Sequence, residues 1–226
     1  MIDVNQHISA VQRRVGTRTL EAGEARVVTI DRTFAASVDE VWDACTTLER
    51  IPRWFAPITG ELRVGGRYQL EGNAGGVVER CDPPRSFAAT WEFGGEVSGI
   101  EVGLAPTADG GTRLTIDHVA HVDDQFWEKF GPGAVGIGWE LGLLGLAGHL
   151  GAPGVPTPAE SEAWYPTEEA RAFIASSSDG WCAAHVASGA DPGTARASAD
   201  RTTAFYTGVP EETPDVAPAE VANPAP

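Results

Sequence analysis

SVDEVWDACTTLERIPRWFAPITGELRVGGRYQL, residues 37–70, decides the fold because it places a capped helix, an aromatic bend and a strand in one short run. Ser37 followed by Glu40 is the capping-box pattern that opens a helix, and apolar residues then recur at helical spacing over residues 38–45. Proline and aromatic residues end this pattern, and a pair of glycines leads into the next strand. The run therefore predicts a helix with one apolar side, a bend and a strand, in that order.

Strand patterns lie on both sides of this run. Residues 26–34 alternate, with Val28, Ile30 and Phe34 on one face. Later short segments are separated by clusters of Gly, Asn, Asp or Pro, which is typical of an antiparallel meander. These segments are residues 67–71, 77–81, 87–93, 97–104 and 112–119. The chain therefore predicts an antiparallel sheet.

Two helices are predicted after the sheet. Residues 123–133 contain three aromatic side chains and predict a short helix. Residues 138–150 are apolar on most sides, which is typical of a buried helix. Each interior glycine of this second helix costs roughly 1 kcal/mol of helix propensity. Close packing or a shaped cavity must therefore compensate for the glycines.

Five blocks of the chain, taken in order over residues 26–150, carry a resemblance. They are VW..C...ERIPRWF, LRVGGRYQL, ERCDPPRSFAATWEF, GGTRLTIDH and GW.LGLLGLAGHL. Together they resemble the family of homologues of the activator of the heat-shock-protein-90 ATPase, in the START-like or SRPBCC superfamily. The resemblance implies an α+β helix-grip fold (START-like, Bet v-like), in which an antiparallel sheet curves around a long C-terminal helix and a cavity lies between them. It does not select a function, because the superfamily includes lipid carriers, aromatic polyketide cyclases, ring-hydroxylating subunits, resistance proteins and co-chaperone modules.

The predicted organisation has five parts. They are an N-terminal extension (1–24) that forms a strand or a short helix, the helix-grip domain (25–151), a proline-punctuated linker (152–163), a helical appendage (164–208) and a disordered acidic Pro/Ala tail (209–226). Within the appendage, Thr167, Asp179 and Asp191 are each placed to cap a helix. The aromatic residues of the appendage can dock on the main domain or on a partner.

Charge and cysteine content narrow the function classes. The formal net charge is -16, and Lys129 is the only lysine, so the surface repels phosphate backbones and anionic membranes. The three cysteines, Cys45, Cys81 and Cys182, form no CxxC pair and predict neither a disulfide framework nor a cysteine zinc site. No apolar run reaches the ~20 residues that span a bilayer. We therefore expect a cytoplasmic protein without metal, cofactor, bound nucleic acid or membrane insertion.

Candidate ligand-binding residues follow from alternation and from the resemblance. Leu114, Ile116 and His118 share one strand face, so His118 points into the cavity if its two neighbours do. An imidazole there can act as a general base or bond a ligand, whereas the simpler interpretation is a histidine bonded to a carbonyl or to solvent. The resemblance places aromatic residues around the cavity. Core filling is the favoured interpretation for most of them, whereas Trp54 and Phe55, at the bend near the cavity mouth, are expected to contact a ligand. The candidates are Trp42, Trp54, Phe55, Tyr68, Trp91, Phe93, His118, Trp139 and Leu143.

Three functions stay open at this point. The favoured one is non-catalytic binding of a small hydrophobic molecule between the sheet and the 138–150 helix. The second is a protein-interaction or co-chaperone-like module that docks through residues 164–208. The third is a polyketide-cyclase-like or hydrolase-like enzyme with His118 as acid or base and Asp117 or Glu101 assisting. Alternation disfavours the third, because Asp117 faces away from His118.

Overall fold

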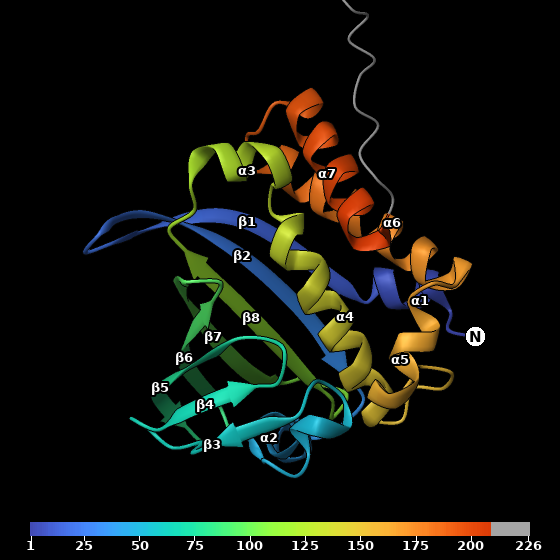
Figure 1. Cartoon of the computed structure of the whole chain (residues 1–226). Coiled ribbons are helices and arrows are strands. Elements are labelled where there is room, and N and C mark those ends of the chain that lie inside the picture. The colour runs from blue at the N-terminus through green and yellow to red at the C-terminus, as the bar shows by residue number, and fades with distance from the viewer. Residues whose placement is uncertain (209–226) are drawn as a thin grey trace, which may run out of the picture.

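The computed structural model describes residues 1–208 and shows a curved antiparallel sheet with a long helix across its concave face (Figure 1). The strands are β1 (Val11–Leu20), β2 (Gly23–Phe34), β3 (Ile58–Gly60), β4 (Arg67–Leu70), β5 (Gly75–Asp82), β6 (Ser86–Phe93), β7 (Glu96–Pro106) and β8 (Thr112–Ala120). They pair in the order β1-β2-β8-β7-β6-β5-β4-β3. The helices are α1 (Val4–Ser9), α2 (Val38–Thr46), α3 (Asp124–Phe130), α4 (Gly133–His149), α5 (Pro158–Trp164), α6 (Glu168–Ala187) and α7 (Pro192–Thr207), with a 3-10 turn at Ile51–Arg53.

The predicted α+β helix-grip fold is confirmed. Helix α2 begins where expected, because the Ser37 side chain accepts a hydrogen bond from the Glu40 backbone N–H at 3.3 Å. The five predicted meander strands correspond to β4 to β8. The three-residue strand β3 was not predicted. The predicted disorder of residues 209–226 lies outside the described residues.

The glycines of helix α4 lie where neighbouring segments approach its backbone closely. It begins at Gly133, five residues before the predicted start. A Cβ atom added at Gly136 would lie 2.2 Å from the Trp181 ring, and one added at Gly145 would lie 2.3 Å from the Trp54 carbonyl oxygen. Glycine therefore lets α6 and the bend at Trp54 approach the α4 backbone, which confirms the predicted close packing.

The segments outside residues 25–151 fold onto the sheet. The N-terminal extension forms both of the elements that were weighed, the helix α1 and the edge strand β1. Helix α5 begins within the expected linker. The predicted helix start at Asp179 is wrong, because α6 runs unbroken from Glu168 to Ala187. Its small residues Ser178 and Gly180 are packed against α7 and Arg13, and this tertiary packing outweighs the local start signal.

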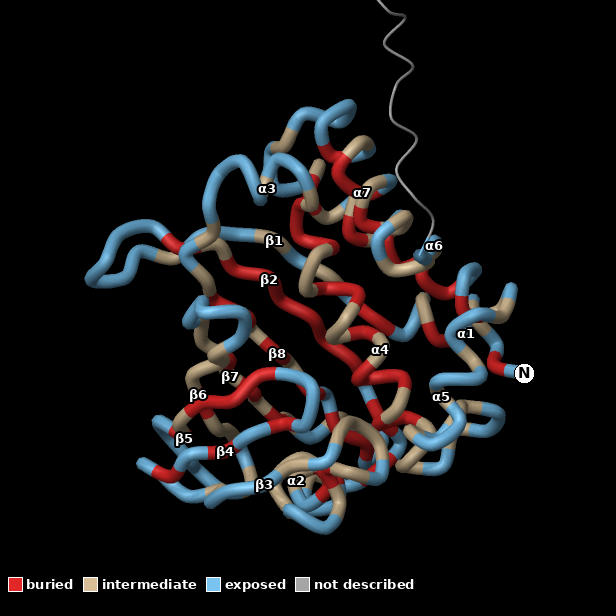
Figure 2. The backbone as a smooth tube through the Cα atoms, viewed as in Figure 1, coloured by how far each residue is buried: buried red, intermediate tan, exposed pale blue. Residues whose placement is uncertain are grey.

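The C-terminal helices share the core of the sheet. Figure 2 shows that buried residues continue from β2 and β8 through α4 into α6. Trp181 and Ile174 of α6 are fully buried in the same cluster as Ile30 of β2 and Leu146 of α4. Within residues 1–208, no single helix is long and apolar enough to cross a membrane, although α3 and α4 together, bent by 58°, meet that length and composition.

A buried ion pair ties β1 to α4. The Arg13 guanidinium donates two hydrogen bonds of 2.6 Å to the Glu140 carboxylate, and the side chains are 9% and 1% exposed. Arg32 is buried close by, with its Nη2 atom 2.7 Å from Nδ1 of His7. Burial lowers the pKa of Arg32 to about 10, and the charge of Glu140 opposes this shift. Glu140 therefore compensates the positive charge beneath α4.

Candidate functional site

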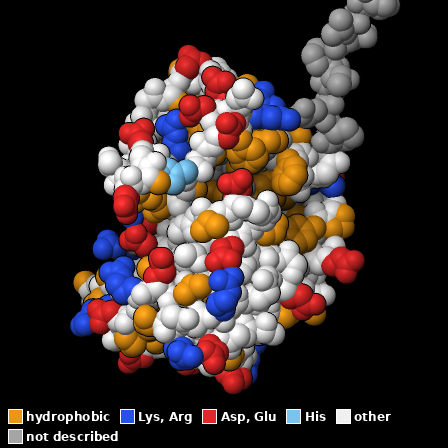
Figure 3. All heavy atoms as spheres, turned by 60° about the vertical axis from the view of Figure 1, so that its left-hand side comes forward, with side chains coloured by type: hydrophobic (Ala, Val, Ile, Leu, Met, Phe, Trp, Pro, Cys, Tyr) orange, Lys and Arg blue, Asp and Glu red, His pale blue; other side chains and the backbone are white. Residues whose placement is uncertain are grey.

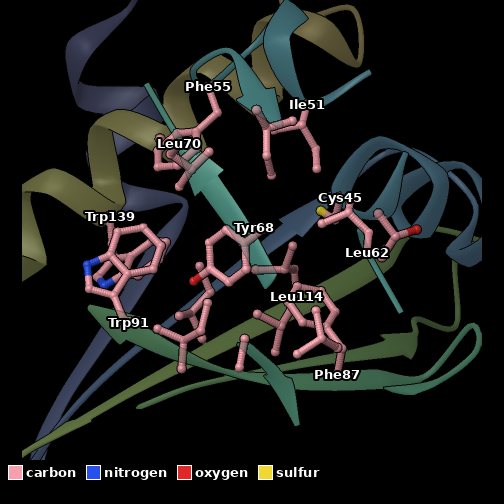
Figure 4. A pocket seen from close by; sticks show the side chains of 18 of the residues that line it. Cys45, Ile51, Phe55, Leu62, Tyr68, Leu70, Phe87, Trp91, Leu114 and Trp139 are labelled. Atoms are coloured by element: carbon pink, nitrogen blue, oxygen red, sulfur yellow. The ribbon is translucent and has the colours of Figure 1, made fainter. Parts of the chain in front are cut away.

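An apolar cavity of about 140 Å³ lies between the sheet and α4 (Figure 4). Its walls come from α2, the bend after α2, β3 to β8 and α4. Trp91 and Trp139 close one end, Cys45 and Leu62 lie at the other, and Tyr68 lies between them. The main lining residues are Cys45, Ile51, Trp54, Phe55, Leu62, Tyr68, Leu70, Ala89, Trp91, Ile100, Leu114, Trp139 and Leu143. We refer to this space as the inner cavity.

The bend after α2 can cover the inner cavity because α4 has a glycine, Gly142, where Phe55 approaches it. The Phe55 ring stacks on Trp139, with 6.4 Å between ring centroids and 7° between planes. A Cβ atom added at Gly142 would lie 3.2 Å from the Phe55 ring. The glycine therefore lets Phe55 lie directly over the helix, where it closes the cavity beside the two tryptophans.

His118 links the two tryptophans. Trp139 donates its indole N–H to His118 Nδ1 at 3.0 Å, and His118 Nε2 lies 2.9 Å from the Ser98 hydroxyl. Because Nδ1 accepts, Nε2 carries the proton and donates it to Ser98, which in turn donates to the Trp91 carbonyl at 3.2 Å. Burial lowers the pKa of His118 to about 4, so the imidazole is neutral at pH 7. The chain of bonds joins the Trp139 indole to the backbone of Trp91.

This arrangement does not support acid or base catalysis by His118. Both of its ring nitrogens are already hydrogen-bonded within the protein. The prediction that Asp117 or Glu101 assists it is wrong, because both carboxylates lie on the opposite face of the sheet. Asp117 accepts a hydrogen bond from Thr29 at 2.5 Å, and Glu101 pairs with Arg18.

The other polar groups of the inner cavity are also paired or neutral. The Tyr68 hydroxyl donates to the Thr90 carbonyl at 2.7 Å, and the Trp54 indole N–H donates to the Ala44 carbonyl at 3.0 Å. Burial raises the pKa of Tyr68 to about 12 and that of the Cys45 thiol to about 12. Neither group is ionised at pH 7, so the cavity offers its contents an apolar surface.

A larger groove of about 520 Å³ lies on the other side of Phe55, Trp91 and Trp139. We refer to it as the outer groove. Figure 3 shows hydrophobic side chains gathered around a hollow on this side of the molecule. The residues that line it beyond the shared three include Phe93, His118, Phe126, Phe130, Val135, Phe205 and Tyr206.

Comparison with known proteins gives the family. The model of the family described as activator of Hsp90 ATPase homolog 1-like protein matches residues 35–151. The chain belongs to this family. The inner cavity, but not α7, lies within the residues that match the family. The START-like fold of this family serves ligand binding and co-chaperone-like roles.

Solved structures agree with this assignment. The crystal structure of CalU16 from Micromonospora echinospora is 35% identical, with a TM-score of 0.60, and the match covers 77% of this chain and 98% of that one. The solution structure of CalU16 is 33% identical, with a TM-score of 0.60 and coverage of 88% and 94%. MLL2253 from Mesorhizobium loti shares the fold at 21% identity, with a TM-score of 0.50 and coverage of 55% and 96%. No curated protein matches the chain.

The structure brings most of the predicted site residues together. Phe93 and His118 line the outer groove, and Trp42 lines neither space but packs edge-on against Phe87, with 6.0 Å between ring centroids. The remaining six line the inner cavity: Trp54, Phe55, Tyr68, Trp91, Trp139 and Leu143. Strand alternation could have added Ala89 and Ile100, whereas only the tertiary structure places Phe205 near the site. In residues 1–208, no group of three or more His, Cys, Asp or Glu side chains is placed to hold a metal ion.

Proposed function

We propose that this member of the activator of Hsp90 ATPase homologue family binds an uncharged apolar small molecule in the inner cavity and does no chemistry on it. The observation that carries the proposal is the pairing of the polar groups around the cavity. Tyr68, Trp54 and Trp139 each donate to a partner within the protein. A ligand with strong hydrogen-bonding groups would lose its bonds to water here without replacement. An apolar ligand loses nothing of this kind and gains contact with aromatic walls.

The volume of the inner cavity limits what it can hold. An apolar cavity of about 150 Å³ stays dry and accommodates benzene. The inner cavity is about 140 Å³, so one aromatic ring or a short branched alkyl group fits. Toluene is therefore a suitable probe for this space.

We expect Ala89→Leu to weaken toluene binding at least tenfold. Ala89 is 3% exposed on β6 and lines the inner cavity, so a leucine there occupies the ligand's space. A tenfold loss corresponds to about 1.4 kcal/mol. Isothermal titration calorimetry with toluene measures the change, and thermal unfolding checks that the variant is folded.

Ala88→Leu is the matched control. Ala88 is the neighbouring residue of β6, and its side chain lies on the other face of the sheet, opposite Glu101. We expect this variant to bind toluene as the wild type does. Equal toluene affinity in all three proteins would show that toluene does not enter the inner cavity.

The protein-interaction alternative stays a prediction, as does a cytoplasmic location. The tryptophans of residues 164–208 that could carry a partner contact face the sheet domain instead. Trp181 is 1% exposed, and Trp164 donates its indole N–H to Glu169 at 2.8 Å while packing near Leu144. Trp181 is therefore unavailable to a partner, and Trp164 is already partly buried against α4.

A further inference from the structure

We propose that the outer groove is a second compartment of the same ligand site, and that it takes a flat, uncharged, multi-ring part of a ligand whose narrow apolar end enters the inner cavity. This inference rests on the proposed function. It adds a ligand class and a role for α7, which lies outside the residues that match the family.

The two spaces share a wall. Phe55, Trp91 and Trp139 line both the inner cavity and the outer groove. The Trp91 and Trp139 rings lie 5.0 Å apart between centroids, and Phe55 stacks on Trp139. One layer of aromatic side chains therefore separates the two compartments, and a ligand that occupies both must pass between these rings.

The outer groove exposes aromatic side chains from three separate elements. Phe93 of β6 is 58% exposed, Phe126 of α3 is 50% exposed and Phe205 of α7 is 74% exposed. Phe130 joins the last two, with ring centroids 5.1 Å from Phe126 and 6.3 Å from Phe205. Exposed aromatic residues gathered at one hollow are typical of a binding surface, whereas single exposed ones need no explanation.

Volume and charge specify the ligand. The inner cavity is smaller than the 300 to 1,000 Å³ that usually hold a drug-sized molecule, whereas the outer groove, at about 520 Å³, lies within that range. Among the described residues, no Asp, Glu, Lys or Arg side chain lines either space. A charged ligand would therefore find no oppositely charged side chain among the lining residues. Aromatic walls instead favour stacking with flat rings.

Two uncharged probes separate the compartments. Toluene is small enough to bind entirely within the inner cavity. N-phenyl-1-naphthylamine has a single ring, which can enter the inner cavity, joined to a fused pair of rings, which can lie in the outer groove. We expect Phe205→Ala to weaken N-phenyl-1-naphthylamine binding at least fivefold and to leave toluene binding unchanged. Because Phe205 is 74% exposed, its truncation leaves the core intact. Fluorescence titration measures the naphthylamine, and calorimetry measures toluene.

Tyr165→Ala is the control, because Tyr165 is also an exposed aromatic residue, at 45%, but lines neither compartment. We expect it to bind both probes as the wild type does. Unchanged naphthylamine affinity in Phe205→Ala, with toluene binding still lost in Ala89→Leu, would overturn the second compartment and leave the proposed function standing. Unchanged toluene affinity in Ala89→Leu would overturn both.

Discussion

Glu140→Ala lowers the free energy of unfolding by about 3 to 5 kcal/mol, the range seen when one partner of a buried ion pair is removed. Glu140 is 1% exposed, and Arg13 loses the only carboxylate that its guanidinium contacts in the described structure. The Arg32 side chain, also buried, loses the opposing charge that supports its ionised form. Urea unfolding followed by far-UV circular dichroism at pH 7 measures the effect.

Arg18→Ala provides the comparison for this prediction. Arg18 pairs with Glu101 on the convex face, where the two side chains are 37% and 41% exposed, so its loss costs about 1 kcal/mol or less. Replacing Arg13 and Glu140 together by methionine restores part of the stability, because the Arg13 guanidinium is then no longer buried without its partner, whereas buried Arg32 still lacks the opposing charge of Glu140. The account is wrong if Glu140→Ala costs no more than Arg18→Ala.

Acidification from pH 7 to pH 4 removes about 3 kcal/mol of stability through His118 alone. The pKa of this imidazole falls from 6.5 to about 4 on folding, because burial disfavours the charged ring. Between these values the unfolded chain binds a proton that the folded chain does not. The contribution of His118 to the free energy of unfolding is therefore complete above pH 6.5, is lost as the pH falls towards 4, and levels off once the pH is well below 4.

His118→Gln isolates this contribution, because glutamine keeps hydrogen-bonding atoms near Trp139 and Ser98 and does not titrate. The pKa values of His7, His149 and His185 are also lowered by burial, but those residues are present in both proteins. We expect the free energy of unfolding to fall about 3 kcal/mol less in the variant than in the wild type over this range. Parallel losses in the two proteins would show that His118 is accessible to protons in the folded state.

Local patterns could predict the walls of the inner cavity. On β6 the odd-numbered residues Phe87, Ala89 and Trp91 face the cavity, and on β8 so do Leu114 and Ile116. Alternation assigns such faces from sequence alone. The same argument placed His118 on the inner face and Asp117 on the outer face, as the structure has them.

Alternation fails where a strand is irregular. The register of β5 shifts between Val78 and Arg80, so Val78 and Cys81 both line the inner cavity, although regular alternation would place residues three positions apart on opposite faces. Nothing in the local sequence signals this bulge. The role of His118 could not be predicted either, because it depends on how Trp139 of α4 and Ser98 of the neighbouring strand β7 are placed around the ring.

The outer groove and α6 depend on long-range packing. Phe205 meets Phe130 because α7 packs on α3, and Trp181 of α6 approaches α4 where Gly136 has no side chain. A single-sequence pattern describes the helices but not which helix faces which. This is why the predicted start at Asp179 was wrong and the groove was not predicted.

The measurement that tests the central claim most directly is a set of nuclear Overhauser effects between bound toluene and the methyl groups of the protein. The account predicts contacts to Leu143, Ile100 and Leu114, which surround the inner cavity and are each at most 7% exposed. These contacts should disappear in Ala89→Leu and persist in Ala88→Leu. Toluene contacts confined to exposed side chains such as Val97, with none to those three residues, would contradict the account.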